Sequence, residues 1–592
     1  MDEGNYILKG LFYATGQYFP YQPNGFLANK LPLSFLIPGW ILQFFERGIT
    51  APRIYALSVS ILFLIGLFLL IRRETNFSFA LLGVWVFALN PIFIKTYSLA
   101  ISQGLIACLF VWSLYFYFGK TRNQIQILIG SLLTSLVVMS RENMIPVIVF
   151  LWVYIFVRHR KNFWIAFFAS LAPIIFIHIL YFPNIMVNWV KWIPVESIKK
   201  TLYDWLGVTL PNIISSQRNG PILFSRITAL FEGIKINLWV FLSFLLAVIF
   251  LISKRIKDRQ FEIFSLSLLF ILLVLMHAWA SVGKNYCIYC FQIYLSFFNF
   301  LGVFIFSLSM YESKNLQLKT PKWVVIGFSL ISFISITFAS YEDMYRSPIY
   351  RWLDENFWKF PLPRIKDFRL AEGSMNIKAI LINKFGWDIE IALKTLFPIF
   401  SVALLVLIIF FLIYMLVIIL NNKRFKFLNS QLWNQMIVMN LLIILLLSPT
   451  FLGGNSSYPF QCQPNVIESI NAAGQTLAKT IEPGSTVDWR SSDSPILLLY
   501  LQDIKLHPPQ LNNDYSYVNS SDTELVERMG MWNEELSMRW LLESDYLIVS
   551  PRDINNDLKL QLQQYYTMAG PSIFLYTCDT ETMNLRVYRR NK

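Results

Sequence analysis

The chain has 592 residues, of which 55% are hydrophobic and only 15% are charged, and its mean hydropathy is +0.50. Water-soluble proteins usually carry about 25% charged residues, so this composition excludes a soluble globular protein, a disordered chain and a fibre. The formal charge of +14 could indicate nucleic-acid binding, but in a membrane protein it more often reflects basic cytoplasmic loops.

Long apolar stretches recur through residues 54–452 and predict a polytopic α-helical membrane protein. A membrane-spanning helix needs about 20 apolar residues, and on this basis we expect about twelve transmembrane helices. They are expected at 54–71, 77–94, 99–118, 125–140, 144–157, 163–183, 236–253, 262–279, 287–310, 322–340, 391–420 and 433–452.

Basic residues gather at alternate junctions between these stretches, and this alternation predicts the orientation. The basic junctions contain Arg72, Arg73, Lys120, Arg122, Arg158, Arg160, Lys161, Lys254, Arg255, Lys257, Arg259, Lys314, Lys319, Lys322, Lys423, Arg424 and Lys426. By the positive-inside rule these junctions are cytoplasmic. The long loops 184–235 and 342–390, the N-terminal end and residues 453–592 are then expected outside the cytoplasm. We expect a multi-pass protein of the bacterial plasma membrane and cell envelope, in contact with the lipid bilayer and without a nucleic-acid partner.

Two segments flank this predicted transmembrane domain. Residues 1–53 are expected to form an outer-face catalytic loop with interfacial helices, because a crossing of the apolar segment 31–47 would break the alternation. The start, with Asp2 and Glu3 directly after Met1, lacks a helix to carry this end across the membrane. Either this end is translocated without a helix of its own or a first transmembrane span precedes Met1, and we expect the second.

Residues 453–592 have the composition of a soluble α/β domain. Pro495–Leu501 and Tyr546–Val549 are typical of strands, and Val466–Thr480 and Ser521–Leu542 of helices. The pair Cys462 and Cys578 also lies here, and an oxidising compartment would permit a disulfide between them. The sequence leaves open whether that disulfide forms.

Motifs for metal or nucleotide chemistry are lacking. The four histidines are scattered, no HExxH occurs, and Gly119-Lys120-Thr121 lacks the upstream glycine of a P-loop. We expect neither a metal nor a cofactor.

The informative residues lie at the predicted outer face. Asp2 and Glu3 begin an aromatic-rich helical pattern, where a carboxylate could act as general base or be a solvated acidic terminus. Lys30 directly precedes the apolar segment, where its ammonium could pair with a lipid phosphate or lie at the membrane interface.

The order of these motifs resembles the GT-C class of membrane glycosyltransferases. The most similar members are the dolichyl-phosphate-mannose–protein mannosyltransferases and the lipid A aminoarabinose transferases. Their Asp-Glu motif is matched by Asp2-Glu3, and their Gly-x-Tyr/Trp-x-x-Pro stretch by Gly16–Pro20. Their Lys-Pro-Pro-Leu motif is matched by Lys30–Leu33, with Leu31 in place of one proline. Two further elements match Ala51-Pro52-Arg53 and Ser140-Arg141-Glu142.

The resemblance implies transfer of a hexosyl or pentosyl group from a polyprenyl-phosphate donor to a glycan, lipid or protein acceptor. It implies that Asp2 is the catalytic carboxylate and that Glu3 supports it. Cationic side chains would hold the carrier phosphate, because a phosphate leaving group needs its charge offset. These are Lys30, Arg53 and Arg141, with Lys284 and Tyr286 as further substrate contacts. The family often has a second acidic residue where this chain has Gln103, and glutamine cannot act as a base.

Two other functions remain open from the sequence. A polysaccharide polymerase or ligase shares large outer loops but normally lacks the Asp-Glu and Lys-Pro elements. A membrane transporter would place charges at mid-span and broken helices within a repeated half. The span interiors here are nearly free of charge, which favours chemistry at the interface over transport.

Overall fold

The structure of the protein is a computed structural model. It describes residues 2–17, 33–88, 91–190, 195–206, 259–283, 290–315, 466–508, 522–528, 532–575 and 583–591, and isolated positions at 193, between 226 and 248, and at 517. The chain forms two compact units. Unit 1 comprises Met1–Leu62, Tyr97–Asn219 and Gln461–Lys592, and unit 2 comprises Phe63–Thr96 and Gly220–Phe460.

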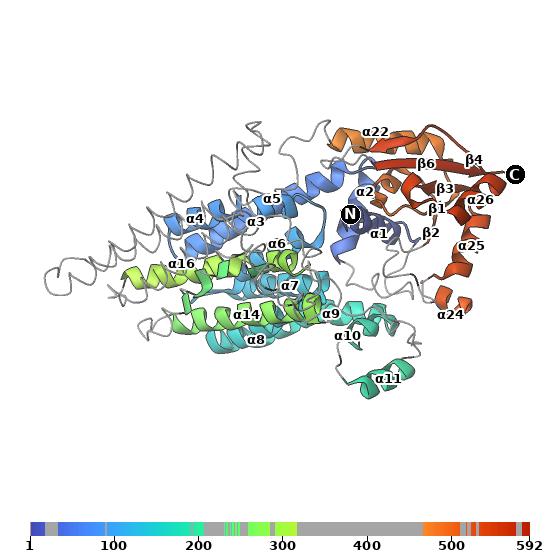
Figure 1. The fold of residues 1–592 in the computed structure, drawn as a ribbon. Coiled ribbons are helices and arrows are strands. Elements are labelled where there is room, and N and C mark those ends of the chain that lie inside the picture. Colours follow the sequence, from blue (N-terminus) through green and yellow to red (C-terminus); the bar gives the residue numbers. More distant parts are fainter. Residues whose placement is uncertain are drawn as a thin grey trace, which may run out of the picture. The chain divides into compact units, whose positions relative to one another are not determined.

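Apolar helices account for most of the described residues before 316 (Figure 1). In chain order they are α1 (Asp2–Ala14), α2 (Leu33–Phe44), α3 (Thr50–Glu74), α4 (Phe77–Ala88), α5 (Pro91–Tyr97), α6 (Ser102–Tyr117), α7 (Gln124–Ser140), α8 (Pro146–Arg158), α9 (Phe163–Leu180), α10 (Val187–Val190), α11 (Glu196–Trp205), α14 (Gln260–Ala278), α15 (Cys290–Tyr294) and α16 (Phe300–Asn315). Among the described residues, three helical stretches are long and apolar enough to cross a membrane: Thr50–Glu74, Arg160–Leu180 and Gln260–Ser281.

The expected spans can be compared with these helices. Those at 54–71, 99–118, 125–140, 144–157, 163–183 and 262–279 coincide with α3, α6, α7, α8, α9 and α14. The stretch 77–94 contains α4 and the start of α5, with residues 89 and 90 outside the described residues, and the stretch 287–310 is divided between α15 and α16. The remaining four, at 236–253, 322–340, 391–420 and 433–452, lie wholly or mostly outside the described residues. The number of spans stays a prediction.

Junctions that the basic residues assign to one face also lie together in the structure. In unit 2, Arg259 pairs with Glu74 at 2.9 Å and with Glu312 at 3.1 Å, so the ends of α3 and α16 meet the start of α14. In unit 1, the Nε2–H of His159 donates to the carbonyl of Gly119 at 2.9 Å. These contacts agree with the alternation of junctions within each unit.

The predicted interfacial segment 31–47 contains α2, which packs against α1. A Cβ atom added at Gly39 would lie 1.9 Å from the carbonyl oxygen of Gly10, so the two backbones touch at this crossing. The rings of Tyr6 and Phe35 stack beside it at 4.7 Å. Small residues allow such close helix packing, and the candidate site is built on this pair of helices, whose contacts run from Tyr6–Phe35 to Ala14–Gln43 in the same direction along both.

The C-terminal region folds around a six-stranded mixed sheet with strand order β2-β1-β3-β6-β4, in which β5 also pairs with β6. The elements are α22 (Val466–Thr480), β1 (Thr486–Trp489), η8 (Pro495–Tyr500), β2 (Lys505–His507), α24 (Thr523–Arg528), α25 (Glu534–Glu543), β3 (Tyr546–Val549), η9 (Pro551–Asp553), α26 (Asn556–Tyr565), β4 (Tyr566–Met568), β5 (Ile573–Leu575) and β6 (Met583–Arg590). β1 is parallel to β2 and β3, whereas β6 is antiparallel to its neighbours.

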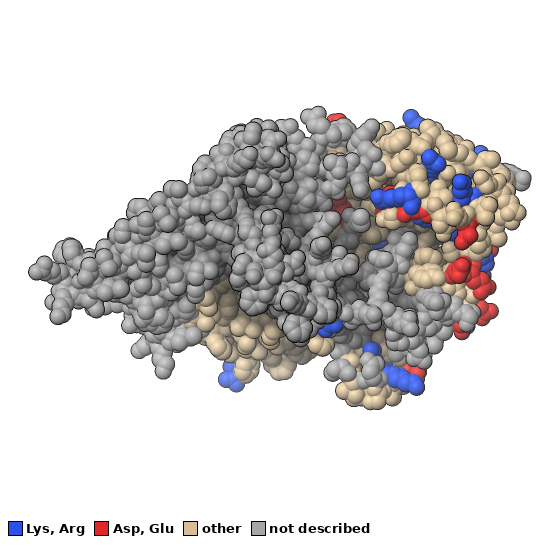
Figure 2. Space-filling view, in the orientation of Figure 1, with Lys and Arg blue, Asp and Glu red and all other residues tan. Residues whose placement is uncertain are grey.

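Side chains of β3 alternate between the two faces of this sheet. Tyr546 and Ile548 pack with residues of α22 and η8, whereas Leu547 and Val549 pack with α25 and α26. All four side chains are buried, as is typical of a strand covered on both faces. On the face shown in Figure 2, charged side chains of both signs gather on the surface of this region.

Two expectations for the C-terminal region are wrong. Pro495–Leu501 was expected as a strand, but Pro495–Tyr500 forms the 3-10 helix η8, because a short buried apolar run does not distinguish a strand from a buried helix. The expected helix Ser521–Leu542 is divided into α24 and α25. The side chain of Asn533 accepts a hydrogen bond from the backbone N–H of Leu536 at 2.9 Å and starts the second helix as its N-cap. The helix at Val466–Thr480 and the strand at Tyr546–Val549 are confirmed.

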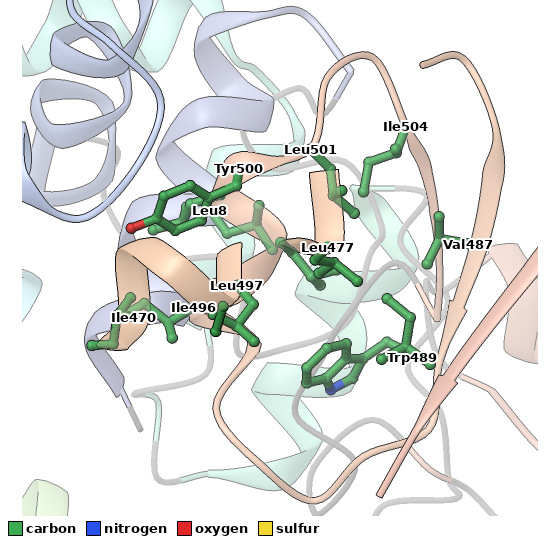
Figure 3. Close-up of a cluster of buried hydrophobic side chains, with 14 of the residues drawn as sticks. Leu8, Ile470, Leu477, Val487, Trp489, Ile496, Leu497, Tyr500, Leu501 and Ile504 are labelled. Carbon is green, nitrogen blue, oxygen red and sulfur yellow. The ribbon is translucent and has the colours of Figure 1, made fainter. Parts of the chain in front are cut away.

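The largest part of the C-terminal core is shared with the N-terminal helices. Ile7, Leu8 and Leu11 of α1 and Leu42 of α2 are buried in one cluster with residues of α22, η8 and the sheet. Figure 3 shows Leu8 beside Tyr500, with Leu477 and Trp489 deeper in the cluster. The two ends of the sequence therefore fold together within unit 1.

Candidate functional site

Glu3 is the centre of the candidate site. It lies in the first turn of α1, where the helix dipole favours a carboxylate, and only 6% of it is exposed. Its Oε2 accepts a hydrogen bond from Nη2 of Arg53 at 2.6 Å, and its Oε1 accepts one from the backbone N–H of Ala100 at 2.8 Å. Both oxygens of this buried carboxylate are thus occupied, and it joins three segments of unit 1.

Arg53 lies in the first turn of α3 and is the cation of the site. Its side chain is 30% exposed, so the guanidinium pairs with Glu3 and still faces outward. Its buried Nε has no hydrogen-bond partner within the described residues. Since a guanidinium offers five N–H donors, Arg53 can hold Glu3 and bind a second anion at once.

The segment before α6 supplies the third contact. Ala100 donates from its backbone to Glu3, and Gln103 follows in the first turn of α6 with 6% of its surface exposed. The hydroxyl of Ser102 donates to Oε1 of Gln103 at 3.3 Å. This position, where an acidic residue occurs in the resembling family, is therefore a buried amide close in the chain to the Glu3 contact.

Arg141 lies at the C-terminal end of α7, the helix that follows α6. It is the C-cap residue of α7, 7% exposed, and its backbone N–H donates to the carbonyls of Val137 and Val138. Glu142 and Asn143 follow in the 3-10 turn η1 (Glu142–Met144) and are also buried. The structure thus assigns Arg141 to a second buried polar segment of unit 1, and Arg141 takes no part in the hydrogen bonds of Glu3 given above.

An apolar cavity of about 730 Å³ begins beside this second polar segment. Val138 and Ile145, which flank Arg141 in the chain, both line it. Apolar side chains of α7, α8 and α9 form most of its wall. The exception is a hydrogen-bonded pair, in which Nε1–H of Trp189 donates to Nε2 of His178 at 2.6 Å. The cavity has the lining of a site for a hydrocarbon chain.

Several residues predicted for the site lie outside what the structure describes. Asp2 begins α1, but its side chain is outside the described residues, as are Lys30, Lys284 and Tyr286. Cys462 and Cys578 are outside them too, so the disulfide between them stays untested. Of the eight predicted site residues, Glu3 and Arg53 are brought into contact with each other.

Two members of the site carry no signal in the sequence. The backbone N–H of Ala100 acts independently of its side chain. Asn5, two residues after Glu3 on α1, has a buried Oδ1 with no partner within the described residues. An asparagine in a helical stretch is common, and only the burial of its Oδ1 without a partner among the described residues makes it a candidate for binding a ligand hydroxyl.

Comparison with known proteins gives one similarity. The sequence matches no family model, and no curated protein matches it. Similar solved structures include crystal structures of ArnT from Cupriavidus metallidurans bound to undecaprenyl phosphate and in the apo state. Both alignments cover 99% of this chain and 93% of the ArnT chain at 11% identity, with TM-scores of 0.43 and 0.44. Similarity at this level assigns no activity to the chain.

Proposed function

We propose that this protein is a membrane glycosyltransferase that moves a sugar from a polyprenyl-phosphate carrier to an acceptor hydroxyl on the non-cytoplasmic face. The observation that carries the proposal is the Glu3–Arg53 pair. It fixes a carboxylate-bearing helix start against an arginine whose side chain is still 30% exposed. A transfer from a phosphate uses a base for the acceptor hydroxyl and a cation for the leaving group.

The different roles of Asp2 and Glu3 follow from the hydrogen bonds of Glu3. Glu3 already accepts hydrogen bonds on both oxygens, so it acts as the structural carboxylate that orients Arg53 and the segment at Ala100. Asp2 then takes the proton of the acceptor hydroxyl. The acceptor oxygen forms a bond to the anomeric carbon as the bond from that carbon to the phosphate oxygen breaks. The electron pair leaves with the polyprenyl phosphate, and the anomeric centre is inverted.

Cations then bind the carrier phosphate in this mechanism. Arg53 is the cation nearest the carboxylates, and Lys30, Arg141 and Lys284 add charge, with Tyr286 and Gln103 as polar contacts. The apolar cavity beside Arg141 supports a lipid-linked donor, because a hydrocarbon chain could lie in it. The sugar is a hexose or a pentose, and the acceptor is a glycan, lipid or protein.

The topology is proposed on the same basis. The basic junctions that meet in each unit are assigned to the cytoplasm, and the site and residues 453–592 to the other side of the bacterial plasma membrane. Residues 1–53 form the catalytic segment, residues 54–452 the transmembrane domain and residues 453–592 the extracytoplasmic α/β domain. Labelling of cysteines introduced at exposed Glu46 and at Lys161 in intact cells tests this orientation, and only the first is expected to react.

Sugar transfer by the purified full chain tests the reaction. Undecaprenyl phosphate, which ArnT binds in one crystal structure, is a suitable carrier for a panel of linked hexoses and pentoses. Asp2→Asn should abolish transfer while the folded yield persists, because an amide cannot accept the proton. Glu46→Gln, which removes an exposed carboxylate shortly before α3, is the matched control. Unchanged transfer by Asp2→Asn would remove the base assignment, and the absence of transfer from every linked sugar would contradict the function.

A further inference from the structure

The 3-10 helix η8 of the C-terminal region contacts both helices that carry the Glu3–Arg53 pair. Its first residues lie against the start of α1. A Cβ atom added at Gly4 would lie 3.0 Å from the backbone nitrogen of Ile496 and 3.1 Å from Oγ of Ser494. Gly4 follows Glu3 directly, so η8 fixes the position of the turn that presents Asp2 and Glu3.

The last residue of η8 reaches the start of α3. The hydroxyl of Tyr500 accepts a hydrogen bond from the backbone N–H of Ile49 at 3.4 Å and donates one to Oδ1 of Asn471 at 2.5 Å. The carbonyl of the same Ile49 accepts from the backbone N–H of Arg53 at 3.1 Å. One residue therefore links the Tyr500 hydroxyl to the backbone of the site's arginine.

The ring of Tyr500 is held in a slot between two glycines. A Cβ atom at Gly474 of α22 would lie 2.3 Å from the ring, and one at Gly48 would lie 2.9 Å from it. Gly48 also has a φ of +138°, a conformation that favours glycine. Burial raises the pKa of Tyr500, so its hydroxyl stays protonated and can donate to Asn471. The slot leaves the ring little freedom to move.

We propose that Tyr500 is a positioning residue for the transfer reaction: by holding the N-terminus of α3, it sets Arg53 at the distance from Glu3 that the chemistry requires. This inference rests on the proposed function. It makes the C-terminal region part of the active-site framework, because the same short helix holds α1 through Gly4 and α3 through Tyr500. Glu3 and Arg53 meet at 2.6 Å between those two contacts.

The first test is Tyr500→Phe in the full chain, which removes the hydroxyl and keeps the ring in its slot. We expect kcat to fall about tenfold while KM for the polyprenyl-phosphate sugar changes less than about twofold, because misplacement of a catalytic group affects the reacting geometry more than binding. The matched control is Tyr566→Phe in the same region. The hydroxyl of Tyr566 is also buried, but it donates to the carbonyls of Leu541 and Ser544. Tyr566→Phe should keep kcat within about twofold of the wild type at a comparable loss of thermal stability.

A second variant displaces the ring and keeps the hydroxyl. Gly474→Ala puts a methyl group into the slot and should reproduce the loss of kcat. Amide hydrogen exchange over residues 49–53 provides a readout without substrate, and it should be faster in Tyr500→Phe than in Tyr566→Phe. This comparison remains informative if Gly474→Ala fails to fold.

The outcomes separate the inference from the function on which it rests. Wild-type kcat in Tyr500→Phe, or an equal loss in Tyr566→Phe, would overturn the positioning role while Asp2→Asn still tests the transfer reaction. Unchanged exchange at residues 49–53 in Tyr500→Phe would overturn it as well. If the wild type transfers no linked sugar, the proposed function fails. Faster amide exchange at residues 49–53 in Tyr500→Phe would then show only that Tyr500 stabilises the N-terminus of α3.

Discussion

Two ion-pair networks of this chain both consist of arginine and glutamate side chains. They differ in how many donors of the central arginine remain available to a ligand. In unit 2, Glu74 accepts from Arg73 and Arg259, both at 2.9 Å, and Arg259 also binds Glu312. Arg259 is 15% exposed, and its donors are divided between two carboxylates. In unit 1, Arg53 holds one carboxylate, and 30% of its side chain is exposed. The donors of Arg259 are thus shared between two carboxylates, whereas Arg53 can accept a further anion.

The largest expected effect on stability is that of Arg259→Ala. It leaves the buried Glu74 and the partly buried Glu312 with less compensating charge, which should lower the free energy of unfolding by about 3 to 5 kcal/mol. Thermal unfolding in detergent measures this loss. Arg589→Ala, which breaks an exposed pair with Glu482, is the control and should cost less than about 1 kcal/mol. If Arg259→Ala abolished sugar transfer at unchanged stability, the contrast between the two networks would be lost.

A smaller loss of stability and a larger loss of activity are expected from Arg53→Ala. Because Arg53 is partly exposed, the unfolding free energy should fall by about 1 to 3 kcal/mol, whereas kcat/KM should fall at least about a hundredfold. Arg53→Lys, which keeps the charge but not the planar fork, should retain the fold and recover part of the activity. The measurement is steady-state transfer from the linked sugar. Equal activity of Arg53→Ala and wild type would show that Arg53, like Arg259, only stabilises the fold.

The smallest expected effect concerns His507, a buried titratable group of unit 1 away from the Glu3 contacts. Its ring stacks on Trp540 at 4.9 Å, and burial and then the nearby Lys505 lower its pKa from 6.5 to about 4. Between these values the unfolded chain binds the proton and the folded chain does not. Stability should therefore fall as the pH falls from 6.5 towards 4. His507→Phe keeps an aromatic ring and should flatten this part of the profile without changing transfer at pH 7.

An unchanged pH profile in His507→Phe would assign the acid sensitivity to other groups. A loss of transfer at neutral pH would extend the functional part of unit 1 beyond the Glu3–Arg53 pair. Either result sharpens the contrast between groups that stabilise the fold and groups left open for a ligand.

Local patterns predicted the elements more reliably than the contacts between them. Helices such as α3, α7 and α14 follow from long apolar runs, and β3 follows from a short run of β-forming residues. The run Pro495–Leu501 did not reveal its helical form, because its burial is complete and carries no periodicity. The division between α24 and α25 depends on one capping bond of Asn533. Boundaries that depend on single contacts are not visible in apolar patterns.

The candidate site was also predicted only in part, because contacts between distant segments leave no local pattern in the sequence. The order of motifs predicted Glu3 and Arg53 as members of one site, and the structure joins them across 50 positions of sequence. The N–H of Ala100 could not be predicted, since every residue except proline carries one. The contact of Tyr500 with Ile49 bridges 451 positions and leaves no local signal.

The shared core of α1, α2 and the C-terminal region has a consequence for biogenesis. Ile49 is synthesised 451 residues before Tyr500. At translation rates of about 5 to 20 residues per second, Tyr500 is synthesised roughly 20 to 90 seconds after α1 and the start of α3. During that interval Ile7, Leu8 and Leu11 lack the protein surface that buries them in the finished fold. Assembly of the site therefore follows synthesis of the C-terminal region, and a chain that is released early cannot form the contacts that hold Glu3 opposite Arg53.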